Sequence, residues 1–313
     1  MHKTKDKLIY VFGHINPDTD SICSAIAYAN LKQVKNLDNY IAARLGEVNK
    51  ETDFALKYFN IKPPILIEDV SGKDVVLVDH NDKAQSGKGI ETAQILEIID
   101  HHPITNLTTK LPIYIHTEPV GSTATLIYKK YLNYGITPGK EMAGIMLSGL
   151  LSDTRNLTSP TTTKEDKLVA AALAQLGNIQ GLQAYGKKML QAGSSLKGLT
   201  PAEIIGLDKK EFNFNGLKTV ISHVNTYNHK EIMAKKEMII QALDTYLLET
   251  NSHLGVFAVS DLENISTILI AGGESKGLIH KMFNTTKDII TINKLLSRKT
   301  DIVPNLLKIL EQS

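Results

Sequence analysis

Three short segments of this sequence place carboxylate and imidazole side chains directly after apolar runs. They are GHINPDTDS at 13–21, VDHN at 78–81 and IDHH at 99–102. The apolar runs before them are expected to be strands of a parallel sheet, and the carboxyl ends of such strands meet at one edge. We therefore expect the acids and histidines of the three segments to converge on one site.

The mixture of carboxylates and imidazoles indicates the chemistry of that site. Oxygen and nitrogen ligands suit a first-row divalent ion such as Mn²⁺ and also accommodate Mg²⁺. Shared carboxylates can hold two cations about 3.5 to 4 Å apart, where they activate a water and offset the charge of a phosphoryl group. The pattern therefore predicts a two-metal centre that cleaves phosphate bonds.

The same residues also have structural interpretations. Asp18 and Asp20 follow a proline and could be turn or N-cap residues. An isolated histidine usually makes structural hydrogen bonds, and we assign that role to six of them: His80, His116, His223, His229, His253 and His280. His101 and His102 differ, because adjacent imidazoles behind an acid bring no packing benefit. The combined pattern favours metal binding.

Composition limits the classes of protein that this chain could be. Its 313 residues and 42% hydrophobic content predict two globular domains. Lys and Arg number 35 against 33 acids, without a compact basic run, so nucleic-acid binding has little support. No run approaches the roughly 18 apolar residues of a membrane helix. The single cysteine, Cys23, excludes an intrachain disulfide, lies among small apolar residues and favours a cytoplasmic location.

Alternating apolar and amphipathic stretches predict an α/β fold with a mainly parallel sheet covered on both faces, followed by a second, smaller α/β domain. The expected strands are 8–12, 65–67, 75–78 and 95–99, then 218–224, 256–259 and 267–271. The expected helices are 21–31, 122–131, 141–151, one ending near 176, 182–190 and 230–248. Small and polar residues after 190 predict the linker between the domains.

Several motifs together resemble the manganese-dependent family II inorganic pyrophosphatases of the DHH phosphoesterase superfamily. Besides the three segments, they are PVGSTAT at 119–125, the pair Ser152 and Asp153, and SRKTDIVP at 297–304. DHH alone indicates only the superfamily, whereas GHINPDTDS with SRKTDIVP is far more specific. The resemblance spans almost the whole chain. It implies a DHH metal-binding domain at 1–190, a linker at 191–197 and a smaller DHHA2-like substrate-binding domain at 198–313, with the active site in the cleft between them.

The resemblance also implies ligands. Two Mn²⁺ ions per subunit are expected, with Co²⁺ as an alternative and Mg²⁺ as an additional or substitute ion. One ion would be held by His14, Asp18, Asp79 and Asp153, and the other by Asp20, Asp79, His101 and Asp153. The residues expected to contact the substrate's phosphates and to act in catalysis are His102, Lys210, Arg298 and Lys299. Lys210 is preferred to Lys209 because it stands in the family's D-x-K-E-F context.

The activity that the resemblance implies is hydrolysis of inorganic pyrophosphate to two orthophosphates by a water activated between two metal ions. A cytoplasmic homodimer is expected, with no nucleic-acid or membrane partner, and there is no room for inserted regulatory CBS domains. Pro103, Arg155 and Asn156 depart from the family's pattern without removing a ligand. Arg155 could add a positive charge near the site.

Two other functions share part of this pattern. A DHH phosphodiesterase acting on oligonucleotides, cyclic dinucleotides or polyphosphate would use the same metals, but it typically carries a GGGH-like motif. Here the nearest segment is AGGES at 271–275, without histidine. A metal- or phosphate-sensing module without turnover would be expected to lack a ligand, and all six expected metal ligands are present.

Overall fold

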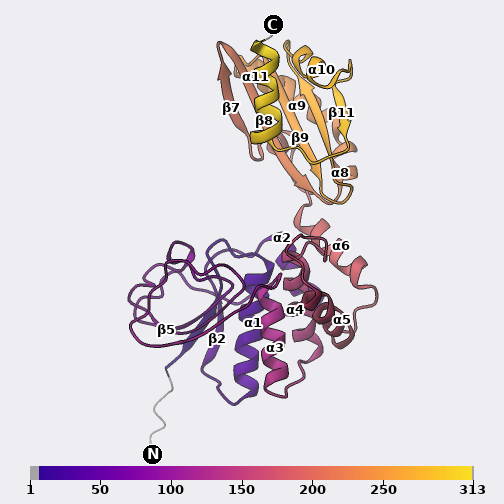
Figure 1. Ribbon diagram of the computed structural model, residues 1–313. Coiled ribbons are helices and arrows are strands. Elements are labelled where there is room, and N and C mark those ends of the chain that lie inside the picture. The colour runs from indigo at the N-terminus through magenta and orange to yellow at the C-terminus, as the bar shows by residue number, and fades with distance from the viewer. Residues whose placement is uncertain (1–6, 312–313) are drawn as a thin grey trace, which may run out of the picture. The chain divides into compact units, whose positions relative to one another are not determined.

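The computed structural model describes residues 7–311, which divide into two compact units between Gly193 and Ser194 (Figure 1). We call residues up to 193 the first unit and the residues from 194 the second unit. The boundary falls within the predicted linker. Among the described residues, no helix is both long and apolar enough to cross a membrane.

The first unit is built on a six-stranded sheet in which every pair of neighbours is parallel, in the order β3-β2-β1-β4-β5-β6. The strands are β1 (Ile9–Phe12), β2 (Tyr40–Arg44), β3 (Ile65–Leu66), β4 (Asp74–Val78), β5 (Gln94–Asp100) and β6 (Tyr114–Thr117). The helices are α1 (Thr19–Val34), α2 (Lys50–Tyr58), α3 (Thr123–Asn133), α4 (Lys140–Asp153), α5 (Lys164–Leu176) and α6 (Leu182–Gly193), with a short 3₁₀ turn, η1 (Lys83–Gln85). The parallel sheet confirms the predicted fold class, although the sequence reading omitted β2, β6 and α2.

The two faces of this sheet are covered differently. On one face α1 and α3 pack against the strands, and α4 packs against α1 and α3 (Figure 1). The core on this face buries Tyr28, Leu31 and Tyr131. The other face buries Phe12 and Leu77 beneath loop residues rather than helices. Both faces are therefore covered as predicted for a parallel sheet, but only one is covered by helices.

A buried acid fixes the loop that leads into α3. The Asp166 carboxylate accepts hydrogen bonds from the Gly121 backbone N–H at 2.9 Å and from the Thr125 hydroxyl at 2.7 Å. It also completes a capping box with Thr163 at the start of α5. One carboxylate thus holds together the beginnings of α3 and α5, and this places the Gly121–Thr123 backbone next to the clustered acids described below.

The second unit contains a five-stranded mixed sheet in the order β11-β10-β9-β8-β7, in which only β8 and β9 are parallel. Its strands are β7 (Lys210–Phe214), β8 (Leu217–Thr226), β9 (Leu254–Asp261), β10 (Ser266–Gly272) and β11 (Ile289–Ile292). Its helices are α7 (Pro201–Gly206), α8 (His229–Met233), α9 (Lys236–Glu249), α10 (Gly277–Phe283) and α11 (Val303–Glu311), the last preceded by the π-helical turn η2 (Arg298–Ile302).

The single helix expected over 230–248 is wrong, because the chain forms α8 and α9 with a break at Ala234 and Lys235. At the break, the Lys235 N–H bonds to the Ile232 carbonyl, three residues earlier. No glycine or proline stands at this point, so the break could not be predicted from local sequence signals. Ile232 and Ile239 are both buried in the same apolar cluster, which supports a tertiary cause for the break.

Candidate metal centre

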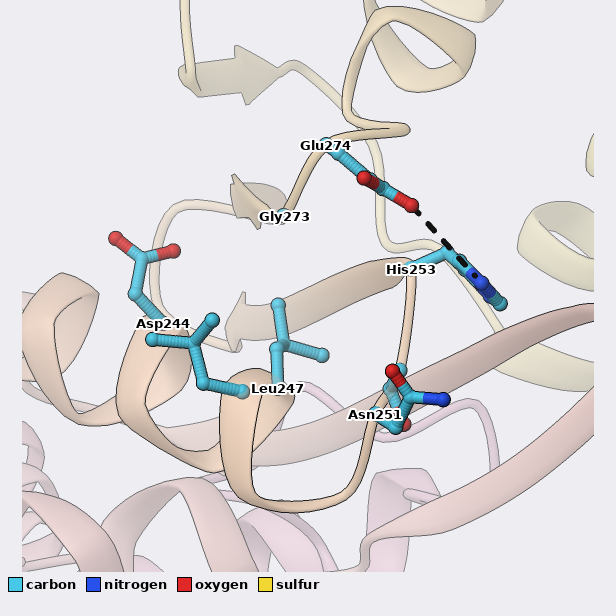
Figure 2. A pocket seen from close by; sticks show the side chains of 8 residues that line it. Asp244, Leu247, Asn251, His253, Gly273 and Glu274 are labelled. Atoms are coloured by element: carbon cyan, nitrogen blue, oxygen red, sulfur yellow. Dashed lines mark ion pairs between the residues drawn. The ribbon is translucent and has the colours of Figure 1, made fainter.

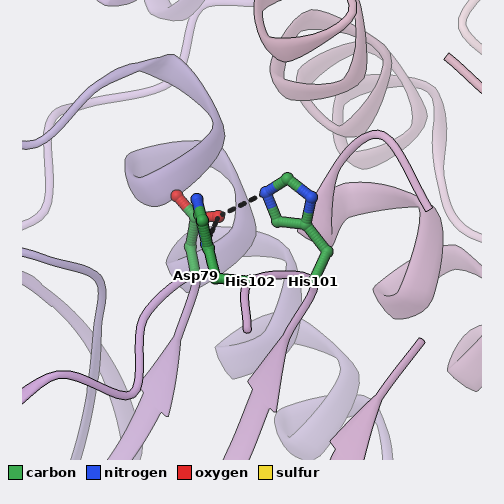
Figure 3. Close-up of side chains that lie close together, drawn as sticks. All are labelled: Asp79, His101 and His102. Carbon is green, nitrogen blue, oxygen red and sulfur yellow. Dashed lines mark ion pairs between the residues drawn. The ribbon is translucent and has the colours of Figure 1, made fainter. Parts of the chain in front are cut away.

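The predicted convergence of the three segments follows from the strand order. β1, β4 and β5 are neighbours in the parallel sheet, with Phe12 opposite Leu77 and Val78 opposite Ile99. The segments that follow these strands therefore leave the sheet at the same edge. Figure 3 shows Asp79, from the end of β4, beside His101 and His102, from the end of β5.

The ligand atoms fall into compact sets in which every pair of atoms lies within 4.8 Å. One set consists of Asp20, Asp79, His101 and Asp153, and it is the set expected for one metal ion. A second set consists of His14, Asp18 and Asp79, which lacks the Asp153 expected with it. Asp79 belongs to both sets, so it has the position that a bridging ligand requires.

Backbone carbonyls orient the two candidate histidine ligands. His101 Nδ1 lies 3.0 Å from the Val120 carbonyl oxygen, and His14 Nδ1 lies 2.8 Å from that of Ile15. A carbonyl can only accept, so each Nδ1 carries a proton, and each Nε2 offers a lone pair once a cation displaces the proton there. His101 Nε2 lies 3.2 Å from Asp153 Oδ2, while His14 Nε2 lies 3.6 Å from Asp79 Oδ2. Both lone pairs are available to a cation.

His102 has a different environment from His101. Its Nδ1 lies 2.9 Å from Oδ1 of the buried Asp100, which also accepts from Asn81 Nδ2 at 2.6 Å. Its Nδ1 is also 3.9 Å from Asp79 Oδ1, but the Asp100 contact already occupies this nitrogen. The side chain is half exposed. We therefore interpret His102 as an imidazole that faces outward through Nε2 rather than as a metal ligand.

Asp18 and Asp20 both cap helices and both belong to the candidate ligand sets, so the two roles that the sequence left as alternatives are compatible. Asp18 caps α1 by accepting from the Ser21 N–H at 2.9 Å. Asp20 is fully buried and caps a different helix, since it accepts from the Thr123 and Ala124 N–H groups of α3 at 2.6 and 3.1 Å. A Cβ on Gly149 would lie 2.6 Å from Asp20 Oδ1, so glycine there makes room for the carboxylate.

Asp79 has an uncommon backbone conformation. Its φ is +61°, in the left-handed region that side chains other than those of Asn and Asp seldom adopt. The Thr123 hydroxyl donates to its Oδ1 at 3.0 Å. Strained residues of this kind cluster at functional sites. The turn directs the Asp79 carboxylate toward the ligand atoms at the end of β5.

The electrostatics of the cluster favour a cation. Burial, with repulsion from Asp20, raises the pKa of Asp79 and of Asp153 well above the usual range. Burial alone would lower the pKa of His101, but the carboxylates of Asp153 and Asp79 beside its Nε2 raise it to about 12. Asp79 Oδ2 and His101 Nε2 are buried without a hydrogen-bond partner. Orphaned acceptors among mutually repelling carboxylates fit a hard divalent ion such as Mn²⁺.

The other histidines have the hydrogen bonds expected of structural residues. His80, next to Asp79, bonds through both nitrogens, to the Val78 carbonyl at 3.0 Å and the Ser86 hydroxyl at 2.9 Å. Burial lowers the pKa of His80 to about 4, so it is neutral at pH 7. The remaining histidines have the following partners: His116 with Glu118, His223 with Ser260, His229 with Asp261, His253 with the Lys218 N–H and His280 with Asp288.

In the second unit, the three cationic residues singled out by motif line one pocket of about 380 Å³. Lys210 comes from the start of β7, while Arg298 and Lys299 come from η2. Lys209 does not line this pocket, because its ammonium bonds the Tyr246 hydroxyl and lies 3.9 Å from the centre of that ring. The two adjacent lysines therefore have different surroundings, and the choice of Lys210 stays a prediction.

The AGGES segment lines another pocket of the second unit, of about 320 Å³ (Figure 2). Gly273 and Glu274 lie there near His253, whose Nε2 is 3.9 Å from a Glu274 oxygen. This imidazole comes from the segment before β9 and not from the position after the glycines. The segment therefore still differs from the GGGH-like motif of the phosphodiesterases.

Three further residues shape these sites in ways that the sequence did not predict. Asp100 orients His102, Thr123 bonds Asp79, and Asp208 bonds Arg298 in the second unit. Asp100 directly precedes His101, and Asp208 lies two residues before Lys210, so their proximity in the sequence indicates a part in these sites. Their partners could not be read from spacing, since Asp208 and Arg298 are 90 residues apart.

Two family models match this architecture. The "DHH family, N-terminal domain" model matches residues 8–150, and the "DHHA2 domain" model matches residues 187–309. Fold and site together define a two-domain protein of the DHH class, with clustered metal-ligand residues in the first domain.

The most similar proteins narrow this class to one family. A Bacillus cereus protein is 40% identical over 300 residues, covering 95% of this chain and 96% of that protein. A Bacillus licheniformis protein is 40% identical over 307 residues, covering 97% and 99%. Both are named "Probable manganese-dependent inorganic pyrophosphatase". The chain belongs to the manganese-dependent inorganic pyrophosphatase family.

Solved structures agree with this assignment. A crystal structure from Methanococcus jannaschii, assigned to the family II inorganic pyrophosphatases, has a TM-score of 0.62 and 37% identity, covering 97% of this chain and 100% of that one. An exopolyphosphatase-related protein from Bacteroides fragilis has a TM-score of 0.51 at 17% identity, covering 98% and 91%, and supports the fold alone.

Proposed function

We propose that this protein hydrolyses inorganic pyrophosphate to two orthophosphates. The observation that carries the proposal is the buried convergence of Asp20, Asp79, His101 and Asp153, with His14 and Asp18 sharing Asp79. Family membership supports the same activity, because the curated relatives are named for it.

The proposed cofactor is two Mn²⁺ ions per subunit, with Co²⁺ as an alternative and Mg²⁺ as an additional or substitute ion. The residues proposed to hold them are His14, Asp18, Asp20, Asp79, His101 and Asp153, with Asp79 and Asp153 as bridges. When bound, such ions lower the pKa of a coordinated water and offset the charge of the phosphates. The clustered carboxylates and imidazoles would hold such ions.

His102 is proposed to move a proton. Its Nδ1–H is held by the buried Asp100, which fixes the ring and leaves Nε2 facing outward. In its doubly protonated form the ring would donate the Nε2 proton to the oxygen of the leaving phosphate and be left as the neutral imidazole with its Nδ1–H. Lys210, Arg298 and Lys299 are proposed to bind the phosphate oxygens, because they line one pocket and supply guanidinium and ammonium donors.

A substrate comparison tests the proposal. The purified protein with Mn²⁺ is expected to release orthophosphate from pyrophosphate much faster than from tripolyphosphate, and to leave a dinucleotide intact. Preference for the dinucleotide would instead favour a phosphodiesterase. Tight binding of manganese and pyrophosphate without turnover would favour a sensing module.

The two adjacent lysines offer a matched test of phosphate binding. Lys210→Met is expected to lower kcat/KM for pyrophosphate roughly tenfold or more, since a charge-assisted hydrogen bond to phosphate is lost. Lys209→Met removes the same charge one residue away, at a side chain bound to Tyr246, and is expected to change kcat/KM little. Equal losses in the two variants, measured by steady-state kinetics, would contradict the assignment.

We also propose a cytoplasmic homodimer without a nucleic-acid partner. β6 is an edge strand of the first sheet, with Tyr114 and Ile115 about half exposed, and an open edge can pair with a second copy. Ile115→Lys is expected to yield a monomer in sedimentation analysis. Leu248→Lys, at an exposed leucine of the second unit, serves as the control and is expected to leave the dimer intact. A monomeric unmodified protein would refute this part.

A further inference from the structure

Most N–H groups of the Arg298 guanidinium are bound by other groups of the protein. Its Nη1 donates to the carbonyl oxygens of Asp208 and Ile221, the latter at 3.3 Å. Its Nη2 lies 2.9 and 3.1 Å from the two carboxylate oxygens of Asp208. The Arg298 side chain is only 12% exposed, whereas that of Asp208 is 57% exposed.

The count of donors shows what remains for a ligand. A guanidinium has five N–H groups, and these contacts use both on Nη1 and one on Nη2. The N–H on Nε and the second N–H on Nη2 have no partner among the described residues. Two neighbouring N–H groups are the number that a phosphate accepts in a bidentate contact.

Asp208 is otherwise unexpected in this pocket. The pocket is lined by Lys210, Arg298 and Lys299, which are suited to a polyanion, while a carboxylate repels one. Asp208 also occupies a strained position, with φ at +38° in the turn before β7. A strained acid in an anion pocket needs a compensating role, and its contacts with Arg298 identify that role.

We propose that Asp208 is a positioning residue that fixes Arg298 so that its free Nε and Nη2 N–H groups bind one phosphate of the substrate. The inference rests on the proposed function and names a contributor that the motifs do not. Asp208 acts through Arg298 and does not contact the substrate. Without it, the long arginine side chain would have to be ordered by the ligand, at a cost in side-chain entropy.

The opposing effect is repulsion between Asp208 and the phosphate. The paired guanidinium offsets most of the Asp208 charge, and solvent screens the rest because this carboxylate is more than half exposed. We therefore expect positioning to outweigh repulsion. Removing the Asp208 charge should then weaken binding, whereas relief of repulsion alone would strengthen it.

The test measures binding of imidodiphosphate, a pyrophosphate analogue, to the Mn²⁺-loaded protein by calorimetry. Asp208→Asn is expected to raise Kd roughly tenfold, because the charged carboxylate that fixes the Arg298 guanidinium is replaced by a neutral amide. Asp208→Glu keeps the charge and is expected to recover part of the affinity. Glu211→Gln removes an acid of the same strand region, bonded to Tyr246, and is expected to leave Kd unchanged.

A double-mutant cycle excludes a merely structural role. In an Arg298→Met background, Asp208→Asn is expected to cause no further loss, because Asp208 has nothing left to position. Unchanged or tighter binding in the single variant, an equal loss in both backgrounds, or no binding by the unmodified protein would overturn the proposal. The proposed function is judged separately, by phosphate release from pyrophosphate by the unmodified protein.

Discussion

Asp79→Asn is expected to reduce pyrophosphate hydrolysis by about 10³-fold, because the loss of several kcal/mol of metal-dependent stabilisation corresponds to that factor. The side chain belongs to both candidate ligand sets, so one substitution weakens both. Asparagine tolerates the left-handed backbone at this position, and the fold should therefore survive. Phosphate release and bound manganese are measured on the same preparation.

Asp82→Asn is the matched control for this experiment. Asp82 lies three residues further on and accepts from the Ala84 N–H at a 3₁₀ turn, outside the ligand sets. It should retain full activity and full manganese content. If Asp79→Asn retained both as well, the bridging role of Asp79 would be refuted.

Manganese is expected to raise the melting temperature of the first unit, and to do so more strongly as pH rises. At a free concentration 100 times Kd, binding contributes about 2.7 kcal/mol, which corresponds to about 5–10 °C for a unit of this size. The ligands must lose their protons to bind, so manganese affinity increases with pH.

Without metal, the melting temperature of the protein should instead fall as pH rises. The pKa values of Asp79 and Asp153 are higher in the folded protein than in the unfolded protein, so protonation of these groups favours folding. The stability that they contribute therefore declines as pH rises above about 4. The pKa of His101 is also raised, and its contribution to the stability of the folded protein declines as pH rises above about 6.5. His80, with a lowered pKa of about 4, acts in the other direction but only up to about pH 6.5.

The diagnostic window is therefore pH 6.5 to 8. Thermal unfolding is followed there with excess chelator and with excess Mn²⁺. The melting temperature with chelator should fall with pH, and the difference between the two samples should widen. A difference that is constant or narrows with pH would contradict the assignment of the buried acids as metal ligands.

The candidate site was largely predictable because its residues follow strands. The apolar runs that stop before Gly13, Asp79 and Asp100 indicated one sheet edge, and the order β1-β4-β5 places them there. Asp153 could not be found in this way, since it ends the helix α4 and joins the cluster only through tertiary packing. The motif resemblance alone indicated it.

Elements without a clear sequence pattern were missed for physical reasons. β6 carries exposed Tyr114 and Ile115 at a sheet edge, so it lacks the continuous apolar run of a buried parallel strand. The break between α8 and α9 has no glycine or proline. The second face of the first sheet is covered by loops, whose packing of Leu107 and Ile113 has no periodicity to recognise.

The left-handed turn at Asp79 narrows the choice of amino acid at this position on two independent grounds. Geometry admits glycine, asparagine and aspartate at little cost, whereas β-branched residues would strain the chain. Coordination demands a negatively charged oxygen donor, which only aspartate supplies among these three. In a laboratory evolution experiment that selects only for folding, we therefore expect asparagine and glycine to replace Asp79. Selection for catalysis should retain aspartate at this position.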